Sequence, residues 1–288
     1  MAQSKPLARL DRNHRLPNIK EFGDYLIRTG DLDPLYIALA GATLEREHLK
    51  RWLFAYWCCY HAGASSWLSE RDGADYWFFF KIMASNTSPP PMQGRWPRGH
   101  ERRHFRGDKA IEAVEVLAQA FPKVEDIVNF LMGGAPKFLE VKERTQSLPQ
   151  FGPWMAFKVA DMLERVMGVP IDFRETEVMM YDQPFKSALA IWEASSAYDE
   201  HIPARSGVIR VAQELEALFR SQMAPPDRKR PVGIQEVETI LCKWKSHNNF
   251  MYPIGMDSLE LREGLAEWAP YSPTAQKLHD ASPGGEPQ

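Results

Sequence analysis

The sequence is short of cysteine, of excess charge and of long apolar runs. Its three cysteines are too few for a disulfide framework, and the adjacent pair Cys58 and Cys59 lies in an apolar helical stretch, where we expect buried thiols. A net charge of −3 over 288 residues excludes a generally basic nucleic-acid coat, so any DNA binding must come from a local patch. There is neither a signal peptide nor an apolar run of membrane length, and the sequence therefore predicts a cytoplasmic protein.

Strand patterns are missing as well. No stretch alternates apolar and polar residues over a useful length, whereas apolar residues recur at helical spacing through most of the chain. The sequence predicts an all-α fold of about a dozen helices, around one extended core or, as we favour, in two helical lobes around a cleft. We expect an N-terminal arm over residues 1–17, one helical domain over 18–268 and a flexible tail over 269–288.

The most apolar stretch, residues 45–60, predicts a central buried helix because its apolar residues lie nearly all round the helix. Thr43 is its expected N-cap. His61 follows, ahead of a run of small residues (AGASS, 62–66) that leaves room for close packing by another element or by a ligand. His61 is therefore either a phosphate-binding residue or a satisfied histidine at a helix corner.

Residues 95–109 hold the densest basic cluster before the C-terminal third, with six Lys or Arg, two His and the aromatic residues Trp96 and Phe105. Arginine forks match the geometry of phosphate, and aromatic rings stack on bases. A solvated basic loop is the alternative, but such a loop would not require the two aromatic residues. The candidate phosphate ligands here are Arg102, Arg103 and Arg106.

Residues 242–257 form a second candidate segment. They gather lysines, a histidine, asparagines, a tyrosine and a glycine turn, and hydrogen-bonding groups on a conformationally special loop are typical of a binding site. The candidates in this segment are Lys243, Lys245, His247, Asn248 and Tyr252.

The clearest local structure is expected over residues 147–172. A short loop (LPQFG, 148–152) precedes a helical run, and Pro153 suits the first turn because its missing N–H would be unpaired there. Gly168 ends that helix. The backbone N–H groups at the helix N-terminus attract a phosphate oxygen. The alternative is an ordinary helix–helix corner, with Asp172 capping the next helix.

This pattern, L-P-x-F-G-P-x-x-A with an aspartate 20 residues after the glycine, resembles the helix-hairpin-helix signature of the DNA glycosylase superfamily. The resemblance implies a helix-hairpin-helix glycosylase-like fold whose hairpin grips DNA through Gln150, Phe151, Gly152 and Trp154. It also implies that Asp172 does chemistry in the base pocket. Lyase-type members carry a nucleophilic lysine where this chain has Trp154, which argues against a Schiff-base lyase reaction.

Three further strings, WCCYHAGASSWL (57–68), ERRHFRG (101–107) and LCKWKSHNNFMYPIGMD (241–257), resemble one offshoot of that superfamily. It is the α-glutamyl/putrescinyl thymine pyrophosphorylase clade, the amino-acid:DNA transferases of bacteriophages. The resemblance implies an enzyme that displaces phosphate or pyrophosphate from 5-(pyro)phosphomethyl-uracil in double-stranded phage DNA, in the host cytoplasm, and makes hypermodified thymine. Glycine, serine, glutamate and putrescine are all open as the nucleophile, with glycine preferred.

The implied chemistry gives the candidates roles. The target base must leave the stack to be reached. The leaving group carries several negative charges, which the arginines of 102–106 and Lys243 or Lys245 could neutralise. The attacking ammonium must lose a proton, and Asp172 is the first candidate base, although it could instead hydrogen-bond the pyrimidine. Lys243 and His247 are further catalytic candidates, no metal ligand is expected, and a part for Mg²⁺ is open.

Two other functions compete with this transferase. A monofunctional DNA glycosylase would hydrolyse the N-glycosidic bond through Asp172 and leave abasic DNA. A non-catalytic binding module would use only the phosphate grip of the hairpin, although the many titratable residues elsewhere argue against it. Nucleoside analysis after incubation with DNA separates all three.

Overall fold

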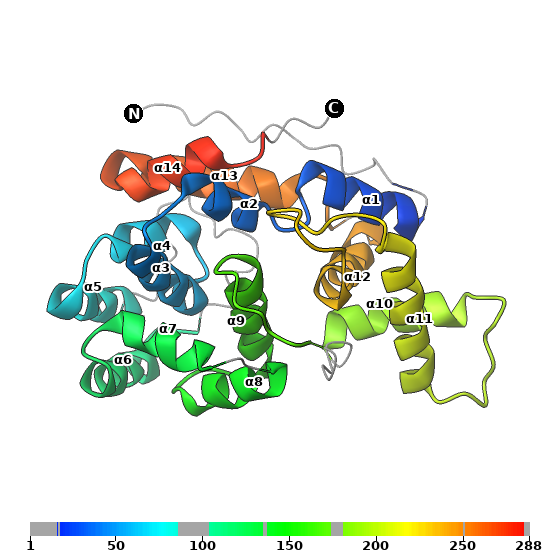
Figure 1. The fold of residues 1–288 in the computed structure, drawn as a ribbon, viewed down its shortest axis with the longest axis horizontal. Helices are drawn as coiled ribbons and strands as arrows, with labels where there is room; N and C mark the ends of the chain where they lie inside the picture. The colour runs from blue at the N-terminus through cyan, green and yellow to red at the C-terminus, as the bar shows by residue number, and fades with distance from the viewer. Residues whose placement is uncertain are drawn as a thin grey trace. The chain divides into compact units, whose positions relative to one another are not determined.

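A computed structural model describes residue 16 and residues 18–85, 104–134, 137–173, 181–249 and 251–284. Over these residues the chain is helical, and its only β pairings are the isolated bridges Lys137–Asp172 and Met223–Pro231. The prediction of an all-α fold is confirmed (Figure 1). No helix within the described ranges is long and apolar enough to cross a membrane.

In chain order the elements are α1 (Ile19–Thr29), α2 (Pro34–Ala42), α3 (Arg46–Cys59), α4 (Ala62–Ser69), α5 (Gly73–Ser85), α6 (Asp108–Ala120), α7 (Val124–Met132), α8 (Phe138–Ser147), α9 (Pro153–Arg165), α10 (Asp182–Glu193), α11 (Ala204–Phe219), α12 (Ile234–Asn248), α13 (Met256–Trp268), the 3₁₀ helix η3 (Ala269–Tyr271) and α14 (Pro273–Ala281). They divide between two compact units. Unit 1 comprises residues 1–34, 176–256 and 283–288, and unit 2 comprises residues 35–175 and 257–282. The chain therefore leaves and re-enters each unit.

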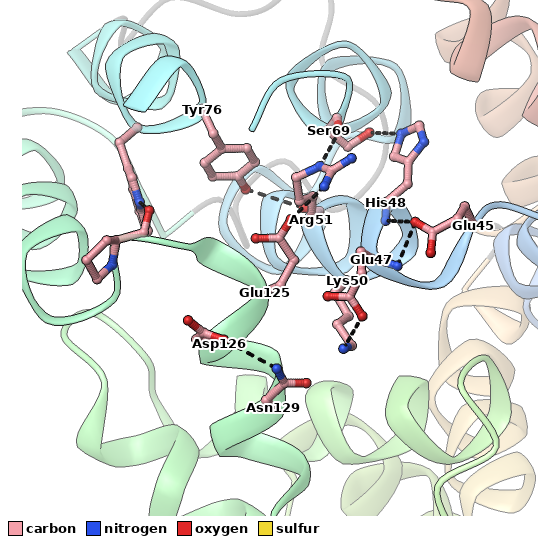
Figure 2. Close-up of polar contacts among 12 residues, drawn as sticks. Glu45, Glu47, His48, Lys50, Arg51, Ser69, Tyr76, Glu125, Asp126 and Asn129 are labelled. Atoms are coloured by element: carbon pink, nitrogen blue, oxygen red, sulfur yellow. Dashed lines mark hydrogen bonds and ion pairs between the residues drawn. The ribbon is translucent and has the colours of Figure 1, made fainter. Parts of the chain in front are cut away.

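Unit 2 is built around α3, which packs against α4, α7 and α9. As predicted, α3 is buried nearly all round, and the thiols of Cys58 and Cys59 lie in the core. Figure 2 shows how its polar residues fasten it at one end: Arg51 pairs with Glu125 of α7 at 2.5 Å and donates to the Ser69 carbonyl of α4 at 2.9 Å. One side chain thus ties three helices together.

The N-cap of α3 differs from the prediction. Glu45, not Thr43, caps the helix, because its carboxylate accepts from the N–H groups of Glu47 at 2.9 Å and His48 at 3.1 Å (Figure 2). Thr43 instead adopts φ 45°, in the left-handed region, and ends the preceding turn. A carboxylate at a helix N-terminus is also stabilised by the positive end of the helix macrodipole, whereas an uncharged threonine hydroxyl gains less from it.

The small residues after His61 are explained by protein packing. A Cβ atom at Gly63 would overlap the indole ring of Trp268 in α13 and lie 2.7 Å from the Gly264 carbonyl oxygen. The absence of a side chain at Gly63 therefore lets α13 approach α4 closely.

The flexible tail expected for residues 269–288 is wrong over residues 269–281, which form η3 and α14. Ser272 caps α14 by accepting from the Ala275 N–H at 3.1 Å, and its hydroxyl donates to Glu70 at 2.6 Å. Thr274, Ala275 and Leu278 are buried on α4. These contacts outweigh the loop-like composition of the segment.

In unit 1, α12 packs against α1, α10 and α11. Two glycines permit the closest approaches, since a Cβ at Gly23 would overlap the Phe219 ring and one at Gly207 would overlap Trp192. The first turn of α12 is fixed by Glu236, whose buried carboxylate accepts from the Gly233 N–H at 2.8 Å and pairs with Arg230 at 3.0 Å. These contacts fix the N-terminal end of α12, and the candidate residues lie at its C-terminal end.

Candidate functional site

The loop and the following helix predicted over residues 147–172 lie in unit 2, and we call α8, this loop and α9 the hairpin. Helix α8 ends at Ser147, a tight loop follows, and α9 begins at Pro153 as expected. Gln150 stands at the exposed tip with φ 68°, a left-handed conformation that a residue other than glycine adopts at some cost. Phe151 anchors the loop in the core, because this residue is 6% exposed and its ring stacks on Phe54 at 6.1 Å.

The N-terminus of α9 is suited to an anion. Gly152 is the N-cap and provides no side-chain hydrogen bond, and a Cβ atom there would meet nothing within 4 Å. Trp154, the second residue of the helix, is half-buried. A helix N-terminus approached through a glycine lets a phosphate oxygen come close to the backbone N–H groups. The side chain of Phe151, by contrast, is used in the core.

Asp172 lies at the other end of the hairpin. After α9, Gly168 turns the chain with φ 71°, and the Val169 N–H returns to the Leu163 carbonyl at 3.0 Å. The backbone carbonyl of Asp172 then accepts from the Phe138 N–H, the first of α8, at 3.0 Å. Asp172 therefore accepts a hydrogen bond from the first turn of α8 through its backbone carbonyl. It does not cap α10, which begins at Asp182.

The hairpin fixes the spacing between its tip and Asp172. Helix α8 has 10 residues, which corresponds to about 15 Å along its axis. Asp172 is at the beginning of that helix, and the loop 148–152 follows its end. Asp172 is a partly exposed residue, and it lies at a site set apart from the hairpin tip.

The basic cluster is described only in part. Arg102 and Arg103 lie outside the described residues, whereas Arg106 is exposed immediately before Gly107, the N-cap of α6. Phe105 is fully buried and stacks on Phe80 at 5.3 Å. The buried phenylalanine therefore anchors the segment and leaves Arg106 at the surface, as a phosphate ligand requires.

His61 is 3% exposed and forms the N-cap of α4, where its Nδ1 accepts from the Ala64 N–H at 3.1 Å. Its ring also contacts the Trp268 ring at 6.1 Å. These contacts match the helix-corner alternative. The predicted phosphate contact of His61 stays a prediction.

Unit 1 brings two candidates of the C-terminal segment, Lys243 and Tyr252, together around Asp31, a residue that the sequence did not reveal. The carboxylate of Asp31 accepts from the Tyr252 hydroxyl at 2.6 Å and from the Gly255 N–H at 2.9 Å. The Lys243 ammonium donates to the backbone carbonyl of Asp31 and, at 3.2 Å, to the Tyr252 hydroxyl. All three side chains are at least nine-tenths buried. We call Asp31, Lys243 and Tyr252 the buried network.

His247 extends this region, and its hydrogen bonds define its tautomer. Its Nε2 faces the N–H of Leu16 at 3.2 Å, so it must be the unprotonated acceptor. Its Nδ1 faces the carbonyl of Tyr252 at 3.1 Å, so it carries the proton. Phe22 stacks on the ring at 4.6 Å. His247 is therefore held as a neutral imidazole with both nitrogens engaged.

The remaining candidates of the segment lie nearer the surface. Lys245 is half-buried and donates to Gln183 of α10 at 3.0 Å, while Asn248 is exposed at the last residue of α12. Met251, just beyond, is 74% exposed. The buried network thus supports a short surface segment that carries polar and apolar groups available to a ligand.

Asp31 was missed because its partners are far away in the chain. The carboxylate and Tyr252 are separated by 221 residues, and the local string TGDLDP reads only as a turn before a helix. No local pattern marks such a contact. Among the residues that the structure describes, no group of three or more His, Cys, Asp or Glu side chains is arranged to hold a metal ion.

Two known relatives of this chain are bacteriophage enzymes. The profile of the family described as amino acid:DNA transferase matches residues 25–251. The glycinyltransferase of Pseudomonas phage PaMx11 is 43% identical over 288 residues, which cover 95% of this chain and 99% of the relative. The putrescinyltransferase of Delftia phage PhiW-14 is 26% identical over 271 residues, which cover 91% of this chain and 82% of the relative.

Proposed function

Because the chain belongs to the amino acid:DNA transferase family, we propose that it transfers glycine to a modified pyrimidine base in phage DNA, in the cytoplasm of the host cell. The observation that carries the choice of glycine is the 43% identity to a glycinyltransferase over nearly the full length of both chains. The putrescinyltransferase is the more distant of the two at 26% identity, so the donor pocket should resemble that of the glycine enzyme more closely.

The proposed acceptor is a uracil whose 5-hydroxymethyl oxygen carries phosphate or pyrophosphate. The glycine nitrogen forms a C–N bond to the methylene carbon, the C–O bond breaks, and phosphate or pyrophosphate leaves with the bonding electrons. Free glycine is an ammonium ion at neutral pH, so one proton must pass to a base before the nitrogen lone pair can attack. The base must also be extruded from the duplex for the methylene carbon to be reached.

Asp172 is the proposed base. Its backbone is fixed at the start of α8 while the residue stays half-exposed, which suits a group that must meet a donor from solution and return the proton to water. Arg106 is exposed and suited to neutralise the leaving group as charge builds on it, together with Arg102 and Arg103. Gln150, Gly152 and Trp154 are the proposed contacts to the DNA backbone at the hairpin tip.

The C-terminal segment is proposed to bind the smaller substrate or the leaving group through Lys245 and Asn248. Lys243 and His247, predicted above as catalytic, are proposed to act through that segment, because both are buried and hydrogen-bonded within unit 1. Tyr252 belongs to the same support. A buried lysine that holds a loop in place positions the groups that touch the substrate and need not touch it itself.

Nucleoside mass spectrometry tests this function. DNA containing 5-phosphomethyl- or 5-pyrophosphomethyl-uracil is incubated with the protein and with glycine, serine, glutamate or putrescine, and is then digested. Glycine transfer gives a nucleoside heavier than thymidine by one glycine less two hydrogen atoms. A putrescine product with no glycine product would refute the choice of donor, and free base with abasic DNA would identify a glycosylase instead.

Asp172→Asn tests the assignment of the base. The amide keeps the size of the side chain and the backbone bond to Phe138, so the fold should be unchanged while product formation falls by about 10²–10⁴-fold. Gln213→Ala, at an exposed position of α11 in unit 1, is a surface control. Full activity of Asp172→Asn, with the melting temperature unchanged, would exclude Asp172 as the base.

A further inference from the structure

Three half-buried aromatic rings meet beside the hairpin tip, and none of the roles above uses them as a group. Tyr60 follows α3, His104 precedes α6, and Trp154 belongs to the first turn of α9. The ring of Trp154 lies 5.5 Å from that of Tyr60 and 6.3 Å from that of His104, between centroids. All three belong to unit 2. We call them the aromatic trio.

Tyr60 is held in an unusual backbone conformation. It is the C-cap of α3 with φ 51° and ψ 38°, in the left-handed region that residues other than glycine rarely occupy. Its N–H donates to the Tyr56 carbonyl at 2.7 Å, and its ring stacks on that of Tyr56 at 4.9 Å. Tyr56 in turn stacks on Trp52 at 5.1 Å. The ring of Tyr60 is therefore the outer end of a rigid aromatic column.

His104 is held by its neighbours in the chain. The Phe105 N–H donates to the Cys58 carbonyl at 3.4 Å, and the Gly107 N–H donates to the Ala84 carbonyl at 2.8 Å. These bonds fix the segment against α3 and α5. The imidazole lies nearly parallel to the Phe151 ring, at 18° and 6.4 Å. Both bonded neighbours are backbone groups, so the position of His104 does not depend on a flexible side chain.

The imidazole of His104 behaves as an apolar ring. Its Nε2 is buried and has no hydrogen-bond partner among the residues that the structure describes, and burial lowers the pKa of the ring below its usual value. A histidine that paired with phosphate would be expected to carry charge and to keep its nitrogen accessible. The Nε2 atom of His104 is buried, and the lowered pKa disfavours the charged ring, so both observations favour stacking over a phosphate contact. Its flat, neutral ring is suited to stacking.

We propose that Tyr60, His104 and Trp154 form a stacking platform for an unpaired nucleobase of the DNA strand held at the hairpin tip. The argument rests on the family's DNA substrate, on the position of the trio next to Gly152, and on a surface of flat rings without charge. Stacking accepts any base, so the platform would hold a neighbour of the target base and need not recognise sequence.

The test is DNA binding as a function of salt concentration, using the full-length chain and a fluorescent thymidine oligomer of about 12 nucleotides, which fits the site size of such surfaces. Loss of a stacked ring reduces affinity by about 5- to 150-fold. It should leave the slope of log Kd against log salt unchanged, because no counterion is released by a ring. Loss of a phosphate contact lowers the magnitude of that slope by about 0.7 for a single strand.

Trp154→Leu and His104→Leu should each weaken binding with an unchanged slope, whereas His104→Phe, which keeps a flat ring, should bind within about twofold of the wild type. Tyr271→Leu is the matched control, since Tyr271 is an aromatic residue of unit 2 that is 72% exposed outside the trio. Thermal unfolding confirms that each variant is folded. If Trp154→Leu does not fold, the paired His104 variants decide the question.

Unchanged affinity in the leucine variants, or a reduced slope, would overturn the platform. The second result would assign the trio to phosphate binding. The proposal rests on DNA binding by this family and not on the donor, so the two failures are distinguishable. A protein that binds the oligomer through the trio but transfers no glycine retains the platform and loses the proposed function.

Discussion

Tyr252 provides the sharpest test of the buried network. Its hydroxyl donates to the Asp31 carboxylate at 2.6 Å and accepts from the Lys243 ammonium at 3.2 Å, and the residue is only 1% exposed. Tyr252→Phe removes both hydrogen bonds and keeps the shape of the ring. The carboxylate and the ammonium each keep their burial and have one partner fewer.

The magnitude follows from the charge of the partner. A hydrogen bond to a charged group contributes about 1.5–3 kcal/mol, and its loss is felt more strongly when the partner stays buried. We therefore expect Tyr252→Phe to lower the free energy of unfolding by about 1.5–3 kcal/mol. For a chain of this size, that loss corresponds to roughly 3–12 °C in melting temperature.

Urea unfolding followed by circular dichroism measures the change. Tyr198→Phe is the control, because Tyr198 lies in the same unit and is 48% exposed, so its hydroxyl is free to bond water. We expect that control to remain within about 0.5 kcal/mol of the wild type. An equally small effect for Tyr252→Phe would mean that Asp31 and Lys243 do not depend on the hydroxyl, and the support proposed for residues 245–255 would be wrong.

Two further outcomes follow from unit 2. Gly63→Ala should destabilise the protein by about 1–3 kcal/mol in urea unfolding, because the added methyl group overlaps the Trp268 ring. Gly134→Ala is the control and should be neutral, because a Cβ atom there meets nothing within 4 Å. Equal stability of the two variants would show that α13 can move away from α4 at no cost. Burial, with a smaller contribution from Arg51, lowers the pKa of His48 below 6.5. The unfolded chain therefore binds the proton more readily, so the stabilisation is complete above pH 6.5 and is lost as the pH falls below it. His48→Gln should flatten the fall in melting temperature between pH 7 and pH 5, and a curve that keeps the wild-type slope would contradict this.

Helical periodicity predicted the fold class because a buried face repeats along the sequence of each helix. The apolar stretch over residues 45–60 and the hairpin loop before Pro153 appear where they were expected. The sequence shows residues 62–66 only as a run of small residues and does not indicate the helix over 62–69, because its apolar partner, Trp268, is distant in the chain. The prediction of a flexible tail over residues 269–281 is wrong for a similar reason, although Ser272-Pro273 is a helix-start signal in its own right.

The candidate site was predictable to the extent that its chemistry is local. The loop before α9 and the string over residues 241–257 each carry their residues close together in sequence. Asp31 could not be found this way, since its contacts are made by folding and not by spacing. The sequence showed His247 only as a titratable residue, whereas the fold shows both of its nitrogens engaged. Burial of this kind is a property of the whole unit.

The interleaved path of the chain has a consequence for synthesis. Helix α4 is complete at Ser69, yet its partners in α13 and α14 are residues 256–281. At about 5–20 residues per second, those partners leave the ribosome roughly 10–40 s later. During that interval Gly63 and its neighbours present an uncovered apolar surface to the cell. The folding of unit 1 is delayed as well, because residues 19–34 pack against residues 182–256, which are synthesised much later. Unit 1 therefore completes its helices only after residue 248 has been synthesised, and unit 2 only after residue 281.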